Sequence, residues 1–251
     1  NAQDAIVRGV AGIVISPTDS ATAPRVLELA EAAGIPVAIA DIGTNGGKHV
    51  SFIKSNNYEG AHGVGKALAV AMKEKGWEGG KVGIIAISQV RLNGQARTKG
   101  FRDALAEAGI TGDAGLQQMQ KYTPDETFKF VQDMLTANPD MRGLFIQTDG
   151  PTLGALQAIR AARRTGQVLV AAFDGIPEFV PLLQKNEIVV SGMQQPHEMG
   201  AQSARALVEH LKGGTPEAEY TVPILPVTGK NIAARAFRSS KSSRQLWALS
   251  R

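Results

Sequence analysis

The stretch GIVISPTDSATAPRVLELAEAAGIPVAIAD (Gly12–Asp41) decides the fold, because two apolar runs flank a segment with helical periodicity. The first run, Gly12–Ser16, is continuous, which is typical of a strand buried on both faces. The segment after it opens with the N-cap candidates Asp19 and Ser20 and places apolar residues at every third or fourth position. Pro36–Asp41 is the second apolar run. We therefore predict a strand, a helix and a strand.

The same alternation of strands and helices continues along the chain. Further strands are predicted at Val50–Lys54, Lys81–Ile87, Gly115–Gln120, Arg142–Gln147, Val168–Phe173 and Glu187–Met193. Further helices are predicted at Tyr58–Lys75, Asn93–Ala108, Pro124–Ala137, Pro151–Thr165, Pro177–Lys185 and Pro196–Lys212. This order predicts an α/β fold of βαβ units, with parallel sheets covered by helices. Ligands of such folds bind outside the carboxyl ends of the strands.

Composition excludes several classes of protein. The 251 residues are 43% apolar and 20% charged, as expected for one large or two modest globular domains. No apolar run approaches the roughly 20 residues of a membrane-spanning helix, and the sequence as given contains no signal peptide. There is no Cys, and the four His show no paired-ligand spacing. We therefore predict no metal and no cofactor.

The basic character of the chain lies at its carboxyl end. Six of the 27 basic residues lie at or after Lys230, where there is no acidic residue, so the rest has 21 basic and 23 acidic side chains. A basic segment without interleaved aromatic residues gives weak support for nucleic-acid binding. We predict a solvated basic tail at residues 233–251 and no nucleic-acid partner.

Polar side chains follow the predicted strands at the edge where a ligand would bind. They include Thr18, Asp41, Ser55, Ser88, Gln89, Tyr122, Thr148, Asp149, Asp174, Gln194 and Gln195. Carboxylates accept hydrogen bonds from hydroxyls, whereas amides both donate and accept, so this set suits a polyhydroxylated ligand. The alternative for Asp149 and Asp174 is that each caps the helix after it. Both interpretations stay open at this point.

Seven stretches together indicate a family. They are GVAGIVISPTDS (Gly9–Ser20), AGIPVAIAD (Ala33–Asp41), SNNYEG (Ser55–Gly60), RTKGFRDAL (Arg97–Leu105), MLTANPDMRGLFIQTDGPTLGALQAI (Met134–Ile159), AAFDGIP (Ala171–Pro177) and QQPHEMG (Gln194–Gly200). In order and spacing they resemble the type I periplasmic sugar-binding proteins of ABC transporters, in particular the ribose-binding-like group. The resemblance covers nearly all of the chain before the basic tail.

The resemblance implies two Rossmann-like lobes that close by a hinge around a ligand in the cleft between them. One lobe would comprise residues 1–55 plus 195–222, and the other 56–194 plus 223–232. The family's ligand contacts fall on Asp41, Gln95, Tyr122, Thr148, Asp174 and Gln194. The implied protein is not an enzyme. It is a periplasmic solute-binding component, a monomer, that binds a sugar, polyol or cyclitol and delivers it to a membrane permease.

The sequence departs from the family at several positions. Ile42 and Gln95 stand where many members have Arg, and Thr148 replaces a frequent Asn, so ribose itself is a poor candidate ligand. We expect Arg97 to form an ion pair rather than to touch the ligand. Members normally have a strand, a helix and a second strand ahead of the helix that residues 1–9 finish. We therefore expect a fragment with an incomplete first lobe, whose signal peptide lies upstream.

Two other functions fit parts of the sequence. GAHGVGK (Gly60–Lys66) matches the spacing of a phosphate-binding loop, but Ala67 follows where that loop needs a hydroxyl. Its glycines also lie inside a predicted helix, which disfavours nucleotide hydrolysis. The stronger alternative is the effector-binding domain of a lactose-repressor-type transcriptional regulator, which shares the two-lobe fold. The sequence has no helix-turn-helix segment, and AAFDGIP resembles the transport proteins more closely.

Overall fold

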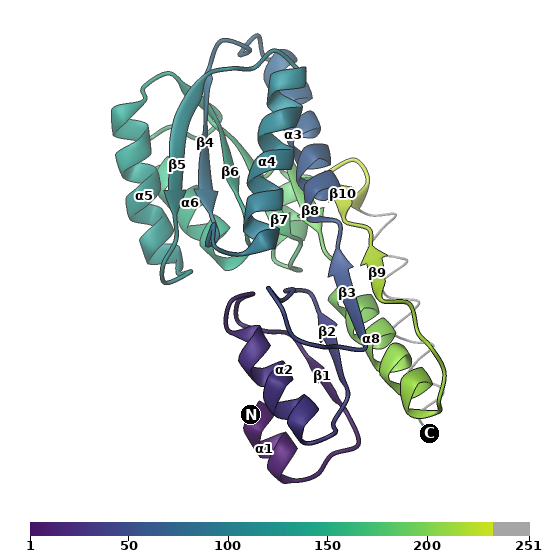
Figure 1. Cartoon of the computed structure of the whole chain (residues 1–251). Helices are drawn as coiled ribbons and strands as arrows, with labels where there is room; N and C mark the ends of the chain where they lie inside the picture. The colour runs from purple at the N-terminus through teal and green to yellow at the C-terminus, as the bar shows by residue number, and fades with distance from the viewer. Residues whose placement is uncertain (233–251) are drawn as a thin grey trace. The chain divides into compact units, whose positions relative to one another are not determined.

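The computed structural model describes residues 1–232, which form two compact units that are treated separately below (Figure 1). Unit 1 comprises Asn1–Glu59, Ser88–Ala96 and Gln194–Ile224, and unit 2 comprises Gly60–Ile87, Arg97–Met193 and, of the described residues, Leu225–Ile232. The predicted tail at residues 233–251 lies outside the described residues.

Unit 1 is built on a four-stranded sheet in which all strands are parallel. The strand order is β1 (Ile13–Ile15), β2 (Val37–Ala40), β3 (Ser51–Ser55) and β9 (Glu219–Val222). The helices of this unit are α1 (Ala2–Val7), α2 (Ala23–Ala32) and α8 (Pro196–Leu211). Leu27 of α2 is buried against Ile39, whereas Met199 of α8 is buried against Ile53. The sheet therefore has apolar layers on both faces.

Unit 2 has a six-stranded sheet in the order β10, β8, β7, β6, β4, β5. The strands are β4 (Lys81–Ala86), β5 (Asp113–Gln118), β6 (Met141–Ile146), β7 (Leu169–Asp174), β8 (Val190–Met193) and β10 (Leu225–Val227). The helices that lie wholly or mostly in this unit are α3 (Asn57–Lys73), α4 (Leu92–Glu107), α5 (Pro124–Ala137), α6 (Gly150–Ala161) and α7 (Phe179–Gln184), and the first residues of α3 and α4 belong to unit 1. Only β10 is antiparallel to its neighbour among these strands.

Alternate residues of β6 show how helices cover both faces of this sheet. Phe145 stacks on Phe101 of α4, with ring centroids 4.3 Å apart. Leu144 and Ile146 point to the opposite face, into the core formed with α5 and α6. Figure 1 shows α3 and α4 in front of the sheet and α6 behind it. The continuous apolar sequence of β6 therefore reflects burial on both sides, as the sequence predicts.

The predicted strands and helices are present, with shifted ends. β8 begins at Val190 rather than at Glu187, because Asn186 has a left-handed φ of +56° and the N–H groups of Glu187 and Ile188 donate to the carbonyl of Leu182 in α7. The sequence patterns did not predict β9 or β10. β9 is mostly exposed and polar, and β10 contains Pro226, which is tolerated because the strand is at an edge.

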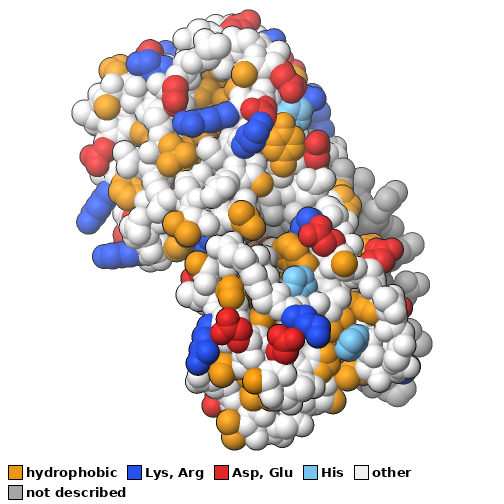
Figure 2. Space-filling view, in the orientation of Figure 1, with side chains coloured by type: hydrophobic (Ala, Val, Ile, Leu, Met, Phe, Trp, Pro, Cys, Tyr) orange, Lys and Arg blue, Asp and Glu red, His pale blue; other side chains and the backbone are white. Residues whose placement is uncertain are grey.

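The surface chemistry agrees with the nearly balanced charge of the chain before its basic end. On the face drawn in Figure 2, acidic and basic side chains are interspersed over each unit. Of the helices in residues 1–232, none combines the length and the apolar composition that crossing a membrane requires.

The contact between α5 and α6 predicts a cost for any side chain at Gly154. A Cβ built there would lie 2.0 Å from the carbonyl oxygen of Pro124. We expect Gly154→Ala to lower the free energy of unfolding by about 1–3 kcal/mol, because the helices must separate. Urea unfolding measures this. Gly150→Ala in the same helix meets no atom within 4 Å and is the matched control. Equal losses in both variants would contradict the explanation.

Candidate functional site

Thr148 and Asp174 lie in contact at the carboxyl ends of the neighbouring strands β6 and β7. The Thr148 hydroxyl donates a hydrogen bond to Oδ2 of Asp174 at 2.8 Å. Asp174 has a φ of +75°, a left-handed conformation that is uncommon outside glycine. It ends β7, whereas Glu178 is the N-cap of α7. The helix-cap alternative is therefore wrong for Asp174.

Asp149 has the other role that the sequence left open. Its carboxylate accepts a hydrogen bond from the backbone N–H of Gly150 at 2.6 Å, and it is the N-cap of α6. The Thr152 hydroxyl donates to the carbonyl of Thr148 at 2.7 Å. The cap interpretation is confirmed for Asp149, and the start of α6 is tied to Thr148.

A buried guanidinium lies behind Asp174. The Arg97 side chain, from α4, is only 3% exposed, and its Nη1 lies 3.2 Å from Oδ1 of Asp174. The same nitrogen donates to the carbonyl of Gln147 at 2.5 Å. The guanidinium carbon lies 4.0 Å from the centre of the Phe173 ring. Arg97 therefore forms an ion pair, as expected, and its partner is a predicted ligand residue.

Gln147 is a buried residue that connects neighbouring elements, and the sequence patterns did not predict this role. Its side-chain oxygen accepts from the backbone N–H of Ile87 at 3.2 Å, and its amide donates to the Thr98 hydroxyl at 2.7 Å. These bonds connect the ends of β4 and β6 to α4. A polar residue directly after an apolar strand can therefore point into the protein. The sequence does not show that Gln147 points inward whereas its neighbour Thr148 contacts Asp174, and only the fold makes this difference clear.

Tyr122 lies in the turn before α5, and a carboxylate holds that turn. Glu126 accepts hydrogen bonds from the backbone N–H groups of Gln120, Lys121 and Tyr122 at 2.9, 2.8 and 3.0 Å. The Thr123 hydroxyl accepts from the N–H of Glu126 at 3.3 Å, as in a capping box. Tyr122 itself has a left-handed φ of +57°. The turn is therefore fixed by a residue outside the predicted contacts.

The other three predicted residues belong to unit 1. Asp41 directly follows β2 with a φ of +66°, and its N–H donates to the carbonyl of Ile53 at 2.8 Å. Gln194 follows β8 in sequence, and its side-chain oxygen accepts from the Ser55 hydroxyl at 2.8 Å. Gln95 is exposed in the first turn of α4, and its amide donates to the carbonyl of Gln89 at 2.9 Å.

Within unit 2, the structure brings Thr148 and Asp174 together but keeps Tyr122 apart from them. Tyr122 follows β5, and β4 lies between β5 and β6 in the sheet. All of these strands are parallel, so the three residues lie at the same edge. Three of the five non-glycine residues with positive φ in the described chain are predicted contacts: Asp41, Tyr122 and Asp174. Such conformations concentrate at functional sites.

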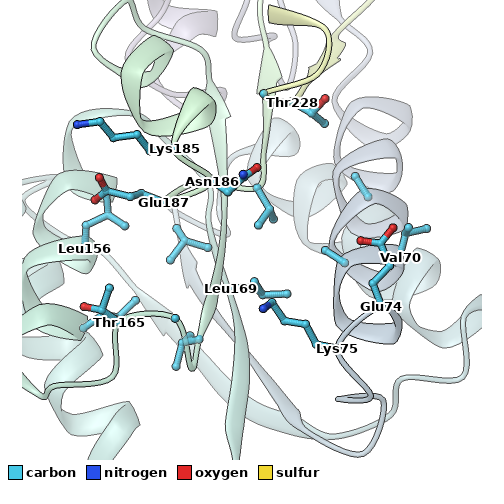
Figure 3. A pocket seen from close by; sticks show the side chains of 18 of the residues that line it. Val70, Glu74, Lys75, Leu156, Thr165, Leu169, Lys185, Asn186, Glu187 and Thr228 are labelled. Carbon is cyan, nitrogen blue, oxygen red and sulfur yellow. The ribbon is translucent and has the colours of Figure 1, made fainter.

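A separate groove of about 800 Å³ lies in unit 2, at the other end of β7 (Figure 3). Val70 of α3 and Glu74 and Lys75, which follow that helix, line one part of it, and Lys185 and Glu187 line another. None of the six predicted ligand residues lines this groove. It is therefore distinct from the strand-end site.

Two features of the structure concern nucleotide and metal binding. The glycine-rich run Gly60–Lys66 lies inside α3 and is not a loop between a strand and a helix, as the sequence predicts. Across residues 1–232, no three His, Cys, Asp or Glu side chains are grouped so that they could hold a metal ion.

Known proteins resemble this chain over most of its length. Residues 1–215 match the family described as "Periplasmic binding protein domain". Ribose import binding protein RbsB of Escherichia coli (strain K12) is 32% identical over 228 residues, which cover 89% of this chain and 73% of that protein. The D-ribose/D-allose-binding protein of Pseudomonas aeruginosa is 32% identical over 229 residues, covering 85% of this chain and 67% of that protein.

A solved structure gives the same result for the fold. The carbohydrate transporter solute binding protein from Agrobacterium radiobacter, in complex with D-arabinose, has a TM-score of 0.86 and 24% identity. The match covers 95% of this chain and 81% of that one. The predicted fold class is confirmed. The relatives are named as binding proteins, which supports neither an enzyme nor the regulator alternative.

Because the Glu126 carboxylate holds the Tyr122 turn, we predict that its contribution to the stability of the protein depends on pH. Burial alone would raise the pKa of Glu126, but the three backbone N–H donors outweigh it and lower the pKa below the ordinary 4.5. A lowered pKa means that the stabilisation is complete above pH 4.5 and is lost as the pH falls further. At pH 7 we expect Glu126→Gln to lower the Tm by about 2–4 °C.

Thermal unfolding of parent and variant from pH 7 to pH 3 measures this effect. The difference in Tm should shrink as Glu126 becomes protonated in the parent. Asp133→Asn, which changes an exposed carboxylate on the same helix, is the matched control. A difference in Tm that stays constant down to pH 3 would rule out the carboxylate as the anchor.

Proposed function

Because this chain belongs to the periplasmic binding protein family, we propose that it is the solute-binding component of an ABC importer for an uncharged sugar, polyol or cyclitol. The observation that supports this most directly is the strained backbone at strand ends. Asp41, Tyr122 and Asp174 all have left-handed φ, and each follows or ends a strand where this fold binds ligands.

The chemistry of the unit 2 residues suits hydroxyl groups. Asp174 is 19% exposed, so its carboxylate can accept from a ligand hydroxyl, and Thr148 beside it both donates and accepts. Tyr122 offers a ring face to the apolar side of a sugar. Arg97 balances the charge of Asp174, so this half of the site favours a ligand without charge.

The proposed ligand is not recognised in the way that ribose is, because the guanidiniums typical of the ribose-binding-like group are replaced. Ile42 and Gln95 stand at those positions, and the amide of Gln95 donates to Gln89 in the free protein. Losing two planar multi-donor groups removes fixed hydrogen bonds to ring oxygens and hydroxyls. We therefore favour a monosaccharide other than ribose, a polyol or a cyclitol.

Binding would proceed by closure of the two units around the ligand. Asp41, Gln95 and Gln194 of unit 1 and Tyr122, Thr148 and Asp174 of unit 2 would all contact the ligand. A ligand that touches both units stabilises the closed state and shifts the population toward it. The closed monomer would then be recognised in the periplasm by the membrane permease.

A thermal-shift screen of sugars, polyols and cyclitols tests this function. We expect one stereochemical group of compounds to raise the Tm of the full chain, since a ligand that binds only the folded state stabilises it. Calorimetry with the best compound should give about tenfold or greater loss of affinity for Asp174→Asn, which removes a charged acceptor. Val70→Ser, in the separate groove of Figure 3, should leave the affinity unchanged.

Other outcomes of the screen would count against the proposal. A flat response across the panel, together with binding to operator-like DNA, would support the regulator alternative instead. Stronger stabilisation by sugar phosphates than by the parent sugars would contradict the predicted preference for an uncharged ligand.

A further inference from the structure

We propose that Arg97 is a positioning residue that fixes the carboxylate of Asp174 for ligand binding. The inference rests on the proposed function, in which Asp174 contacts the ligand. Arg97 itself is not a ligand contact, because its side chain is 3% exposed and lies over the Phe173 ring. It can therefore affect binding only through the groups that it touches.

The two oxygens of Asp174 are held by different elements. Arg97 of α4 contacts Oδ1 at 3.2 Å, and Thr148 at the end of β6 donates to Oδ2 at 2.8 Å. The terminal torsion of an aspartate is otherwise broad, so contacts at both oxygens define the plane of the carboxylate. Each carboxylate oxygen accepts more than one hydrogen bond, so a held oxygen can also accept from a ligand.

Arg97 is in turn held by groups on two strands. Gln147 accepts its Nη1–H at 2.5 Å, and the Phe173 ring supports the face of the guanidinium. Gln147 is itself fixed by Ile87 and Thr98. The planar guanidinium stacks on the ring while its Nη1 reaches the carbonyl and the carboxylate, and the tetrahedral ammonium of lysine lacks this planar geometry. Lysine would keep the charge and lose this arrangement.

Stability alone does not explain an arginine at this position. A buried ion pair adds little net stability compared with apolar side chains of similar volume. The Phe173 ring against the guanidinium belongs to an aromatic cluster, in which Phe145 packs edge-on to Phe173 and stacks on Phe101. An apolar residue would suit this layer, but it would remove the contact to Oδ1 of Asp174.

A double-mutant cycle on ligand affinity tests the inference. The variants are Arg97→Lys, Asp174→Asn and the pair, measured by calorimetry with the compound that most stabilises the parent. We expect Arg97→Lys to weaken binding about tenfold in the parent but less than about threefold when Asp174→Asn is already present. Effects that multiply, or a change below about twofold for Arg97→Lys, would overturn the inference.

Two further variants complete the cycle. Arg160→Lys changes an arginine that pairs with Glu187 on the surface of unit 2, and it should leave the affinity unchanged. An equal loss of affinity for Arg160→Lys would overturn the inference. Arg97→Gln keeps a donor without the charge, and it replaces Arg97→Lys in the cycle if that variant does not fold.

A ligand-free measurement separates this inference from the proposed function. Carbon NMR of the Asp174 carboxyl group, assigned by its loss in Asp174→Asn, should show a changed resonance in Arg97→Lys and none in Arg160→Lys. An unchanged resonance in Arg97→Lys overturns the positioning role. A changed resonance in a protein that binds no compound of the panel would refute the proposed function and leave the positioning of Asp174 supported.

Discussion

The buried charge of Arg97 constrains how unit 2 is assembled. A guanidinium removed from water must be compensated by a counter-charge and hydrogen-bond acceptors, since an unpaired buried charge is strongly destabilising. Its partners Gln147, Phe173 and Asp174 come from the ends of two strands. The parallel pairing of β6 with β7, in which Phe145 is opposite Ala171, brings these ends together beside α4. The register of the sheet and the geometry of the candidate site are therefore linked.

Three of the six predicted ligand residues are held in place by side chains that were not themselves predicted to contact the ligand. Asp174 is held by Arg97, the Tyr122 turn by Glu126, and Gln194 by the Ser55 hydroxyl. Left-handed backbone conformations cost free energy and persist where the surroundings define them. The contacts around Asp174 and Tyr122 stabilise such conformations at strand ends, and they are made within the chain without a ligand.

Among the strands of residues 1–232, the sequence patterns missed β9 and β10. Apolar runs such as Arg142–Gln147 identified strands, because a strand covered on both faces needs them. β9 and β10 have no such run. The run Gly12–Ser16 also forms a strand, but Val14 at its centre is 42% exposed, so the prediction of burial on both faces was wrong there. For the site, the strand-end rule predicted Thr148 and Asp174, which the structure places in contact, and their role as ligand contacts stays a prediction. The rule could not identify Gln147 as a buried residue. That distinction depends on tertiary contacts, such as the one between Arg97 and Gln147, 50 residues apart. The spacing of Thr123 and Glu126 in the sequence is typical of a capping box and would have indicated a helix start there. No sequence pattern indicated that the Glu126 carboxylate accepts hydrogen bonds from the Tyr122 turn.

The connectivity of unit 1 has a consequence for how the chain is made. β3 pairs with β9, so that Lys54 meets Glu219 across a separation of 165 residues. The fully buried Ile53 packs in one cluster with Met199 and Val222, which emerge from the ribosome long after it does. Contacts of such long range form slowly and leave apolar surface exposed in the meantime. During translation, the sheet of unit 1 is therefore completed only after nearly all of unit 2 has been synthesised.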